Sequence, residues 1–374
     1  MHPPPDALFS YLKSLDLAPI WEEAARRFLK IKGVTLVLGG VDTGKSTLCR
    51  YLVSQAYLGG EPVALVDLDL GQSHLGPPGT LGLGLFPPRF PGDQGLFPEA
   101  LYFIGQTSPV GAVLEVAVGS RILVDEARAR GVSHLVVNTS GLIQGPAAFR
   151  LKLAKMELLQ PQLVLALDRE GELAPLLRAL ALEGMILTLP VSPRARRKTL
   201  EERRSHREVR FRQYFAQAKR LELSLETLIW RGYPFGEGAL LTPEELRQWE
   251  SLLKVEVLYG VKGERRLALL VSGSFSGTPR PEIGPGVLLF TPGDLSHRLV
   301  GLWEAPHRTL ALGLILPSSW AQGKLHIWTP WPPEEAHRIR LLSLGRLKVS
   351  PTGQELPKTP WVQESRTGTT PGLD

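Results

Sequence analysis

The sequence predicts an α/β fold, in which a parallel sheet carries helices on both faces, followed by a smaller β-rich domain. Two observations support this prediction. Between residues 33 and 189, apolar runs rich in β-branched residues alternate with helical patterns, which implies right-handed βαβ units. From about Glu222 the pattern changes to short alternating runs separated by glycine and proline, which implies a separate β domain.

Each element of the first domain is predicted from its periodicity. Apolar runs predict strands at 33–38, 63–67, 101–104, 134–138, 163–168 and 185–189. Helical patterns cover 20–29, 45–58, 112–130, 147–159 and 172–182. In the β-rich domain the strand-like runs are VEVLYGV, RLALLVSG, GVLLFTPG, TLALGLIL and GKLHIWTP. We therefore predict a helical segment at 1–30, the α/β domain at 31–221, the β-rich domain at 222–362 and a disordered tail at 363–374.

Composition is that of a soluble globular protein, since 43% of the 374 residues are hydrophobic and 21% are charged. No apolar run is long enough to span a bilayer and the N-terminus lacks signal-peptide features, so we expect no membrane partner and a cytoplasmic location. The one cysteine, Cys49, excludes an internal disulfide framework and a multi-thiolate metal site. We expect it to be a packed core thiol.

The strongest motif lies between the first predicted strand and the helix that follows it. It fits G-x-x-x-x-G-K-[ST], the phosphate-binding P-loop, in which backbone N–H groups at a helix N-terminus surround an anion. An ordinary glycine-rich turn is the alternative, and the strand-loop-helix context favours the P-loop. We expect the lysine to be exposed and to neutralise the β- and γ-phosphates, and the serine hydroxyl to ligate Mg²⁺. The residues are Gly39, Gly40, Val41, Asp42, Thr43, Gly44, Lys45 and Ser46, followed by Thr47.

The second predicted strand ends in two acids, Asp67 and Asp69, which share one face of an extended chain. A lone Asp at a strand end is more often a cap or a turn former, but beside a P-loop it faces the phosphate crevice. One of the two can hold Mg²⁺ through water while the other accepts a proton. The usual guanine-reading motif is absent from the corresponding segment, ALDREGE, so the expected nucleotide is ATP.

A basic segment at 194–220 holds eleven lysines and arginines against three acids. Such a run is usually a solvated face. Here it follows the last strand of the α/β domain, and Arg203, Arg207 and Arg210 share one helical face. We therefore predict a lid that places arginines on the γ-phosphate.

The motifs occur in an order that resembles the polynucleotide 5′-hydroxyl kinases. This family includes the kinase subunit of the eukaryotic pre-mRNA cleavage factor, the ribosomal-RNA-processing kinases and their microbial relatives. The resemblance runs from about Trp21 to Glu355. It rests on the segments GGVDTGKSTLCRYL, VDLDLGQSHLGPPGT, FIGQTSPVG, NTSGLIQG, ERRSHREVRFRQYF, LVGLWE, LALGLIL, LHIWTP and LSLGRLKVSPTGQE.

The resemblance implies a role for each matching residue. Lys45 and Ser46 would bind phosphates and Mg²⁺, and Asp69 would activate the 5′-hydroxyl. Gln72 would lie beside the substrate, and Arg203 and Arg207 would be the lid arginines. The segment Thr139, Ser140, Gly141 and Leu142 would form a clasp on the phosphate-binding loop's lysine.

The sequence departs from the family in two places. Many relatives have tryptophan where Leu142 stands, so an aromatic contact in the clasp is not expected here. Eukaryotic relatives also carry an N-terminal β domain that helps to hold adenine, and too few residues precede Gly33 for such a domain.

The predicted reaction is Mg²⁺-dependent transfer of the γ-phosphoryl group of ATP to the 5′-hydroxyl of an RNA or DNA end. The basic segment suits a nucleic-acid substrate, because contacts to phosphates dominate the affinity for nucleic acids and depend little on the base sequence. Two alternatives remain. One is an ATP-binding scaffold of an RNA-processing complex, and the other is a P-loop NTPase switch that releases phosphate without an oligonucleotide.

Overall fold

The computed structural model describes residues 18–86, 98–180, 185–225, 227–264, 266–273, 286–317, 320 and 323–357. These residues form two compact units that divide between Tyr214 and Phe215, with His307–Thr309 assigned to the first unit. The predicted helical segment at 1–30 is described from residue 18 onward. The predicted tail at 363–374 lies outside the described residues.

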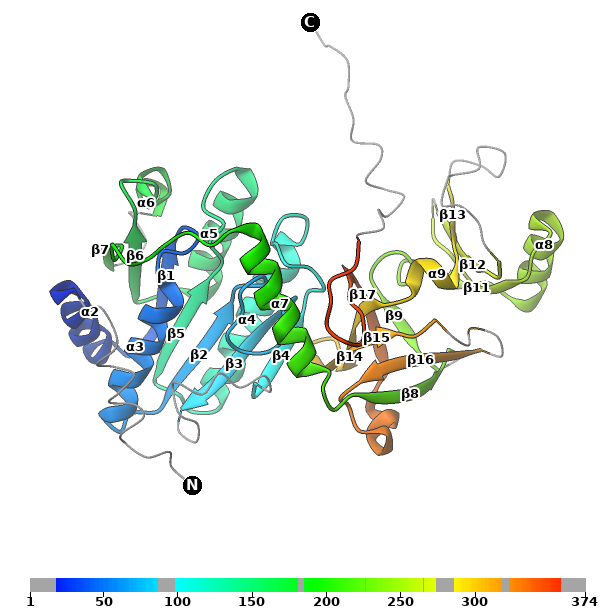
Figure 1. Ribbon diagram of the computed structural model, residues 1–374, viewed down its shortest axis with the longest axis horizontal. Helices are drawn as coiled ribbons and strands as arrows, with labels where there is room; N and C mark the ends of the chain where they lie inside the picture. The colour runs from blue at the N-terminus through cyan, green and yellow to red at the C-terminus, as the bar shows by residue number, and fades with distance from the viewer. Residues whose placement is uncertain are drawn as a thin grey trace, which may run out of the picture. The chain divides into compact units, whose positions relative to one another are not determined.

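The first unit is built on one sheet, whose strands follow the order β7-β6-β1-β5-β2-β3-β4 (Figure 1). The strands from β7 to β2 are parallel, as predicted. Their bounds are β1 (Gly33–Gly39), β2 (Val63–Leu68), β3 (Thr80–Phe86), β4 (Ala100–Phe103), β5 (His134–Thr139), β6 (Leu163–Asp168) and β7 (Met185–Pro190).

The sequence analysis missed β3, which runs antiparallel to both β2 and β4 and makes the sheet mixed. The strand reads TLGLGLF. Glycine is depleted in strands because it raises the conformational entropy of the unfolded chain and has no side chain to pack against neighbours. The structure shows why glycine is needed at Gly82. A Cβ at this position would lie 2.6 Å from the carbonyl oxygen of Leu75.

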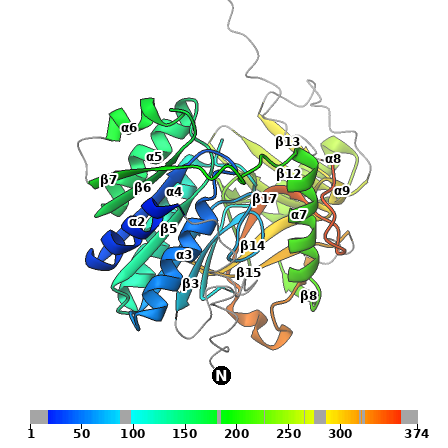
Figure 2. The ribbon, with the colours of Figure 1, turned by 60° about the vertical axis from the view of Figure 1, so that its left-hand side comes forward.

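Helices cover both faces of this sheet (Figure 2). Helices α2 and α3 pack together, and α3 contacts β1, β2 and β5, while α4 packs on β2 and β3 and against α5. The apolar side chains of α2 and α3 join those of the central strands in one core cluster. The bounds are α2 (Pro19–Lys30), α3 (Lys45–Leu58), α4 (Val113–Ala129), α5 (Pro146–Leu159), α6 (Ala174–Leu180) and α7 (Leu200–Tyr214).

Cys49 lies in α3 and is buried in this core. Burial raises the pKa of its thiol, so the thiolate that would be reactive is disfavoured. The prediction of a packed core thiol is confirmed.

The second unit is β-rich, as predicted. Its larger group of strands follows the order β8-β16-β15-β14-β17-β9, and its smaller sheet follows β10-β11-β12-β13 with α8 packed on β11. The bounds are β8 (Lys219–Ser224), β9 (Ile229–Arg231), β10 (Ala239–Leu240), α8 (Pro243–Leu253), β11 (Val257–Lys262), β12 (Leu267–Val271), β13 (Val287–Phe290), α9 (Pro292–Leu295), β14 (Arg298–Ala305), β15 (Arg308–Ile315), β16 (Lys324–Thr329), η2 (Pro333–Arg338) and β17 (Leu341–Lys348).

The sequence analysis also missed α8, although the chain carries a signal for it. Thr242 and Glu245 form a capping box, in which the threonine side chain accepts from the Glu245 N–H and the glutamate accepts from the Thr242 N–H. The pattern T-x-x-E before a helical run is a recognised start signal. Within the described ranges, no helix has the length and apolar character needed to cross a bilayer.

Candidate active site

The phosphate-binding loop joins β1 to α3, as the motif predicted. Asp42 and Gly44 both have positive φ, 57° and 93°, and Gly44 is the N-cap of α3. Glycine adopts this backbone conformation without the steric cost of a Cβ atom, which explains its place directly before the lysine. The Thr43 hydroxyl donates to Gly40 O at 3.1 Å and closes the loop on itself.

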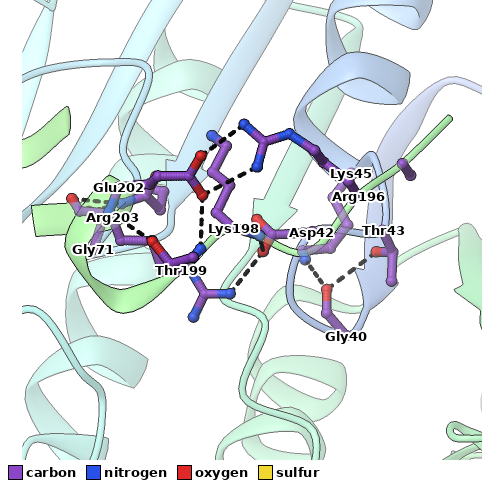
Figure 3. A network of polar contacts seen from close by, with 12 residues as sticks. Gly40, Asp42, Thr43, Lys45, Gly71, Arg196, Lys198, Thr199, Glu202 and Arg203 are labelled. Carbon is purple, nitrogen blue, oxygen red and sulfur yellow. Dashed lines mark hydrogen bonds and ion pairs between the residues drawn. The ribbon is translucent and has the colours of Figure 1, made fainter. Parts of the chain in front are cut away.

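Lys45 is buried, with 6% of its surface exposed, so the expectation of an exposed lysine is wrong. Its Nζ donates to Gly40 O at 2.6 Å, within the same loop (Figure 3). Burial lowers the pKa of Lys45, and the negative charge of Asp69 opposes that shift. The lysine folds back because a buried ammonium needs a hydrogen-bond acceptor, and the nearest carbonyl of the loop supplies one.

Asp67 and Ser46 are linked through Asn138, which the sequence analysis did not single out. Register places Asn138 of β5 beside Asp67 of β2. The Asn138 Nδ2 donates to Asp67 Oδ1 at 2.9 Å and to Ser46 Oγ at 3.3 Å. Polar residues at the carboxyl end of a central strand face the ligand crevice, and this placement is the signal that could have found Asn138.

Both oxygens of the Asp67 carboxylate accept hydrogen bonds from the protein. Its Oδ2 accepts from the His74 N–H at 2.6 Å, and its Oδ1 also accepts from the Asp69 N–H at 3.1 Å. Burial, and then the charge of Asp69, raise the pKa of Asp67 to about 6. A nearby cation would favour the charged form of this carboxylate.

Asp69 differs from Asp67 in its surroundings. It is half-buried, and its Oδ1 accepts from the N–H groups of Gly71 and Gln72 at 3.0 Å each. In the part of the chain that the structure describes, its other oxygen, Oδ2, has no hydrogen-bond partner. One oxygen therefore fixes the side chain in place.

The basic segment reaches the phosphate-binding loop through α7 (Figure 3). The Arg203 guanidinium forms an ion pair with Asp42 Oδ2 at 2.6 Å, and the Lys198 N–H donates to the same oxygen at 2.8 Å. On the other side, Gln72 Nε2 donates to Arg203 O at 3.3 Å. The lid, the loop and the segment after β2 therefore meet at Arg203.

The arginines predicted to share one face of the lid helix have different surroundings. Arg207 lies one turn after Arg203 and is half-buried. Arg210, another turn along, is buried and donates to the carbonyls of His74 and Gly76 at 3.1 Å. Arg210 thus anchors the helix to the loop after β2. The helix itself ends at Tyr214, and the last residues of the 194–220 segment enter β8.

The predicted clasp begins at the last residue of β5. The Thr139 hydroxyl donates to Val37 O in β1 at 2.8 Å. At Gly141 a Cβ atom would lie 2.8 Å from the Cα of Val41, so the clasp packs directly on the phosphate-binding loop. A lysine that the sequence analysis missed, Lys152 of α5, donates to both Thr139 Oγ1 and Ser140 O.

The residues predicted to hold Mg²⁺ fit that ion. Ser46 Oγ and Asp67 Oδ1 lie within reach of one amide group, and the buried Oδ1 of Asn138 has no hydrogen-bond partner among the described residues. Across those residues no group of three His, Cys, Asp or Glu side chains could hold a metal. Mg²⁺ in phosphoryl-transfer sites is typically held by one or two protein oxygens, substrate phosphates and waters.

These features place the chain in the class of P-loop proteins that bind nucleoside triphosphates. The family model described as the mRNA cleavage and polyadenylation factor CLP1 P-loop matches residues 39–217. The polyribonucleotide 5′-hydroxyl-kinase of Pyrococcus furiosus is 33% identical over 340 residues, which cover 90% of this chain and 93% of the relative. The enzyme of that name from Methanocaldococcus jannaschii is 30% identical, and the match covers 86% and 88%.

The chain therefore belongs to the polyribonucleotide 5′-hydroxyl-kinase family, and the resemblance seen in the motifs is confirmed. The Clp1 kinase of Xenopus laevis is 33% identical over a shorter match of 189 residues, 48% of this chain and 43% of the relative. The solved structure of a Clp1p–Pcf11p complex has a similar fold, with a TM-score of 0.59 at 15% identity over 88% of this chain and 79% of that chain.

Proposed function

We propose that this protein transfers the γ-phosphoryl group of ATP to the 5′-hydroxyl end of a polynucleotide. RNA is the expected substrate, because relatives that match over almost their whole length are named polyribonucleotide 5′-hydroxyl-kinases. One observation carries the proposal. The loop with Lys45, the segment with Asp69 and the lid with Arg203 meet at one edge of the sheet.

In the proposed reaction the 5′-oxygen attacks the γ-phosphorus, forms the new O–P bond and displaces ADP, whose β–γ bridging oxygen takes the bonding electrons. Asp69 accepts the hydroxyl proton at Oδ2, the oxygen that has no hydrogen-bond partner among the described residues. Lys45 exchanges Gly40 O for the β- and γ-phosphates. Arg203 exchanges Asp42 for the transferring group, where charge builds up in the transition state.

The cofactor is proposed to be Mg²⁺. Ser46 would hold it directly and Asp67 would hold it through water, and the ion would neutralise charge on the β- and γ-phosphates. The clasp supports the loop through the packing of Gly141 on Val41. Gln72 lies beside Arg203, where the substrate end would enter. A cytoplasmic location remains a prediction from the sequence.

The test is incubation with γ-labelled ATP and Mg²⁺ together with 5′-hydroxyl oligonucleotides of RNA and of DNA. We expect label on the RNA, and none on a matched oligonucleotide that already carries a 5′-phosphate. The Lys45→Met variant is the control for a contaminating kinase. ATP binding without transfer to either oligonucleotide would favour a scaffold, and phosphate release that does not need an oligonucleotide would favour an NTPase switch.

A further inference from the structure

Helix α5 carries two lysines, Lys152 and Lys155, whose side chains are completely buried. Lysine is almost never fully buried unless it has partners. The two residues are three apart and so lie on one face of the helix. Because side chains tilt toward the N-terminus of their helix, both extend toward the edge of the sheet where β5 ends.

Lys152 uses its side-chain nitrogen to hold two consecutive residues of the clasp. Its Nζ donates to Thr139 Oγ1 at 2.9 Å and to Ser140 O at 2.8 Å. The Thr139 hydroxyl in turn donates a hydrogen bond to Val37 O at 2.8 Å. One amine therefore joins α5 to the clasp and, through Thr139, to the strand that leads into the phosphate-binding loop.

The clasp transmits its position to the loop at Val41. The space beside Gly141 is so small that a Cβ would lie 2.8 Å from Val41 Cα and 2.9 Å from Val41 N. Val41 stands between Gly40, whose carbonyl holds Lys45, and Asp42, whose carboxylate holds Arg203. A displacement of the clasp would therefore move the anchoring groups of both cations.

Packing alone does not explain a lysine at this position. Burial lowers the pKa of Lys152 well below its ordinary value, and the charges of Lys155 and Lys45 lower it further. Removing a charge from water is costly, and apolar residues of similar volume are often equally stabilising. An apolar side chain would fill the same space, but it would leave Thr139 and Ser140 without this donor.

We propose that Lys152 is a positioning residue for phosphoryl transfer, which holds the clasp 139–142 against the phosphate-binding loop and thereby fixes the places of Lys45 and Arg203. It acts through these groups and does not touch ATP. The inference rests on the proposed kinase function.

Lys155 provides a matched control in the same helix. It is equally buried, but among the described residues its Nζ has no hydrogen-bond partner and so no hydrogen bond to the clasp. Burial lowers the pKa of Lys155 to about 7, while the charges of Asp69 and Asp67 oppose the shift. A variant at Lys155 therefore reports the loss of a buried lysine near the site without the loss of the clasp contact.

The test compares Lys152→Met with Lys155→Met, because methionine keeps an unbranched chain of similar length and removes the amine. We expect Lys152→Met to lower kcat by about ten- to a hundredfold, the scale expected when reacting groups are displaced by up to an ångström, with little change in the KM for ATP. Its urea midpoint should stay level or rise. Hydrogen exchange of the backbone amides at 139–142 and at Val41 should accelerate. Lys155→Met should keep kcat within about threefold and leave the exchange of the clasp unchanged.

Three results would overturn the proposal. They are an unchanged kcat in Lys152→Met, an unchanged exchange rate at the clasp, and an equal loss of kcat in both variants, which would indicate a general effect of charge. If Lys152→Met does not fold, Thr139→Val tests the same contact from the other side, since it removes the acceptor and keeps the shape. A folded Thr139→Val with unchanged exchange and kcat would contradict the proposal. Hydrogen exchange measures the clasp contact without requiring kinase activity. A wild-type protein that transfers no phosphate would therefore refute the proposed function, while the exchange experiment would still test the role of Lys152.

Discussion

The same substitution, Asp→Asn, separates the roles of the two acids at the end of β2. Asp69 uses only Oδ1 for its hydrogen bonds with the Gly71 and Gln72 N–H groups. Asparagine keeps that acceptor, and its amide group replaces the oxygen that has no partner among the described residues. Asp69→Asn therefore removes the basic site and leaves the loop after β2 in place.

The expected magnitude follows from this geometry. A positioned general base contributes about 10² to 10⁴ in rate, so kcat should fall by that factor, which corresponds to about 3 to 5 kcal/mol in activation free energy. Within the described part of the chain no hydrogen bond of the folded state is lost, and the free energy of unfolding should change by less than about 0.5 kcal/mol. ATP affinity should stay within about threefold of the wild type, because the loop and Lys45 are untouched.

Asp67→Asn is the comparison variant. Both oxygens of Asp67 accept hydrogen bonds, and it is linked to Ser46 through Asn138. If Asp67 serves Mg²⁺ through water, the variant should need more Mg²⁺ for half-maximal activity, and excess metal should partly restore kcat. Asp69→Asn should not respond to added Mg²⁺.

The assay is steady-state transfer from γ-labelled ATP to a 5′-hydroxyl RNA over a series of Mg²⁺ concentrations, with ATP binding measured by calorimetry. If Mg²⁺ rescues Asp69→Asn and not Asp67→Asn, the two roles are exchanged. A folded Asp69→Asn that keeps kcat within a few-fold would show that Asp69 is not the base.

Three further predictions concern the same site. Lys45→Met should abolish transfer while circular dichroism stays unchanged, because methionine fills the buried space that the lysine stem occupies; retained activity would contradict the P-loop assignment. Arg203→Ala and Arg207→Ala should lower kcat more than ATP affinity; a loss confined to RNA affinity, with a reduced salt slope, would instead make the lid a nucleic-acid grip. The pKa of Asp67 is raised from 3.8 to about 6, so the folded state binds its proton more tightly than the unfolded state. Relative to Asp67→Asn, the unfolding free energy of the wild type should therefore fall by about 2 kcal/mol as the pH rises from 4 to 7 in urea titrations, and a flat difference would refute the shift.

The sequence predicted best what depends on consecutive residues. The loop from Gly39 to Ser46 carries its backbone conformation, its helix N-terminus and its cation within one short stretch, so no tertiary information is needed to recognise it. The strands β1, β2, β5 and β6 were equally clear, because strands buried on both faces read as continuous apolar runs. The glycine-rich β3 was missed, because its glycines are required by the close packing of Leu75, which only the tertiary structure reveals.

The remaining features of the site depend on tertiary contacts that the sequence pattern does not reveal. Arg203 and Arg210 share a residue type and a helical face, yet Arg203 binds the loop carboxylate of Asp42 while Arg210 binds backbone carbonyls at His74 and Gly76. Nothing in the spacing distinguishes them. Lys152 looks in sequence like any exposed lysine of an amphipathic helix, and only its burial and its two acceptors give it a role.

Asp42 is an unexpected residue in a loop that binds a polyanion, because a carboxylate repels phosphate. Its side chain resolves the conflict. The carboxylate faces the lid, where Arg203 and the Lys198 N–H share one of its oxygens, and Arg169 donates to its backbone carbonyl. The negative charge is thus neutralised from the side of Arg203 and Lys198. The same ion pair holds Arg203 next to the loop, so in the proposed mechanism the arginine would exchange one anionic partner for another when ATP binds. An exchange of this kind costs less than bringing a solvated arginine into the site, because the guanidinium has already lost much of its water.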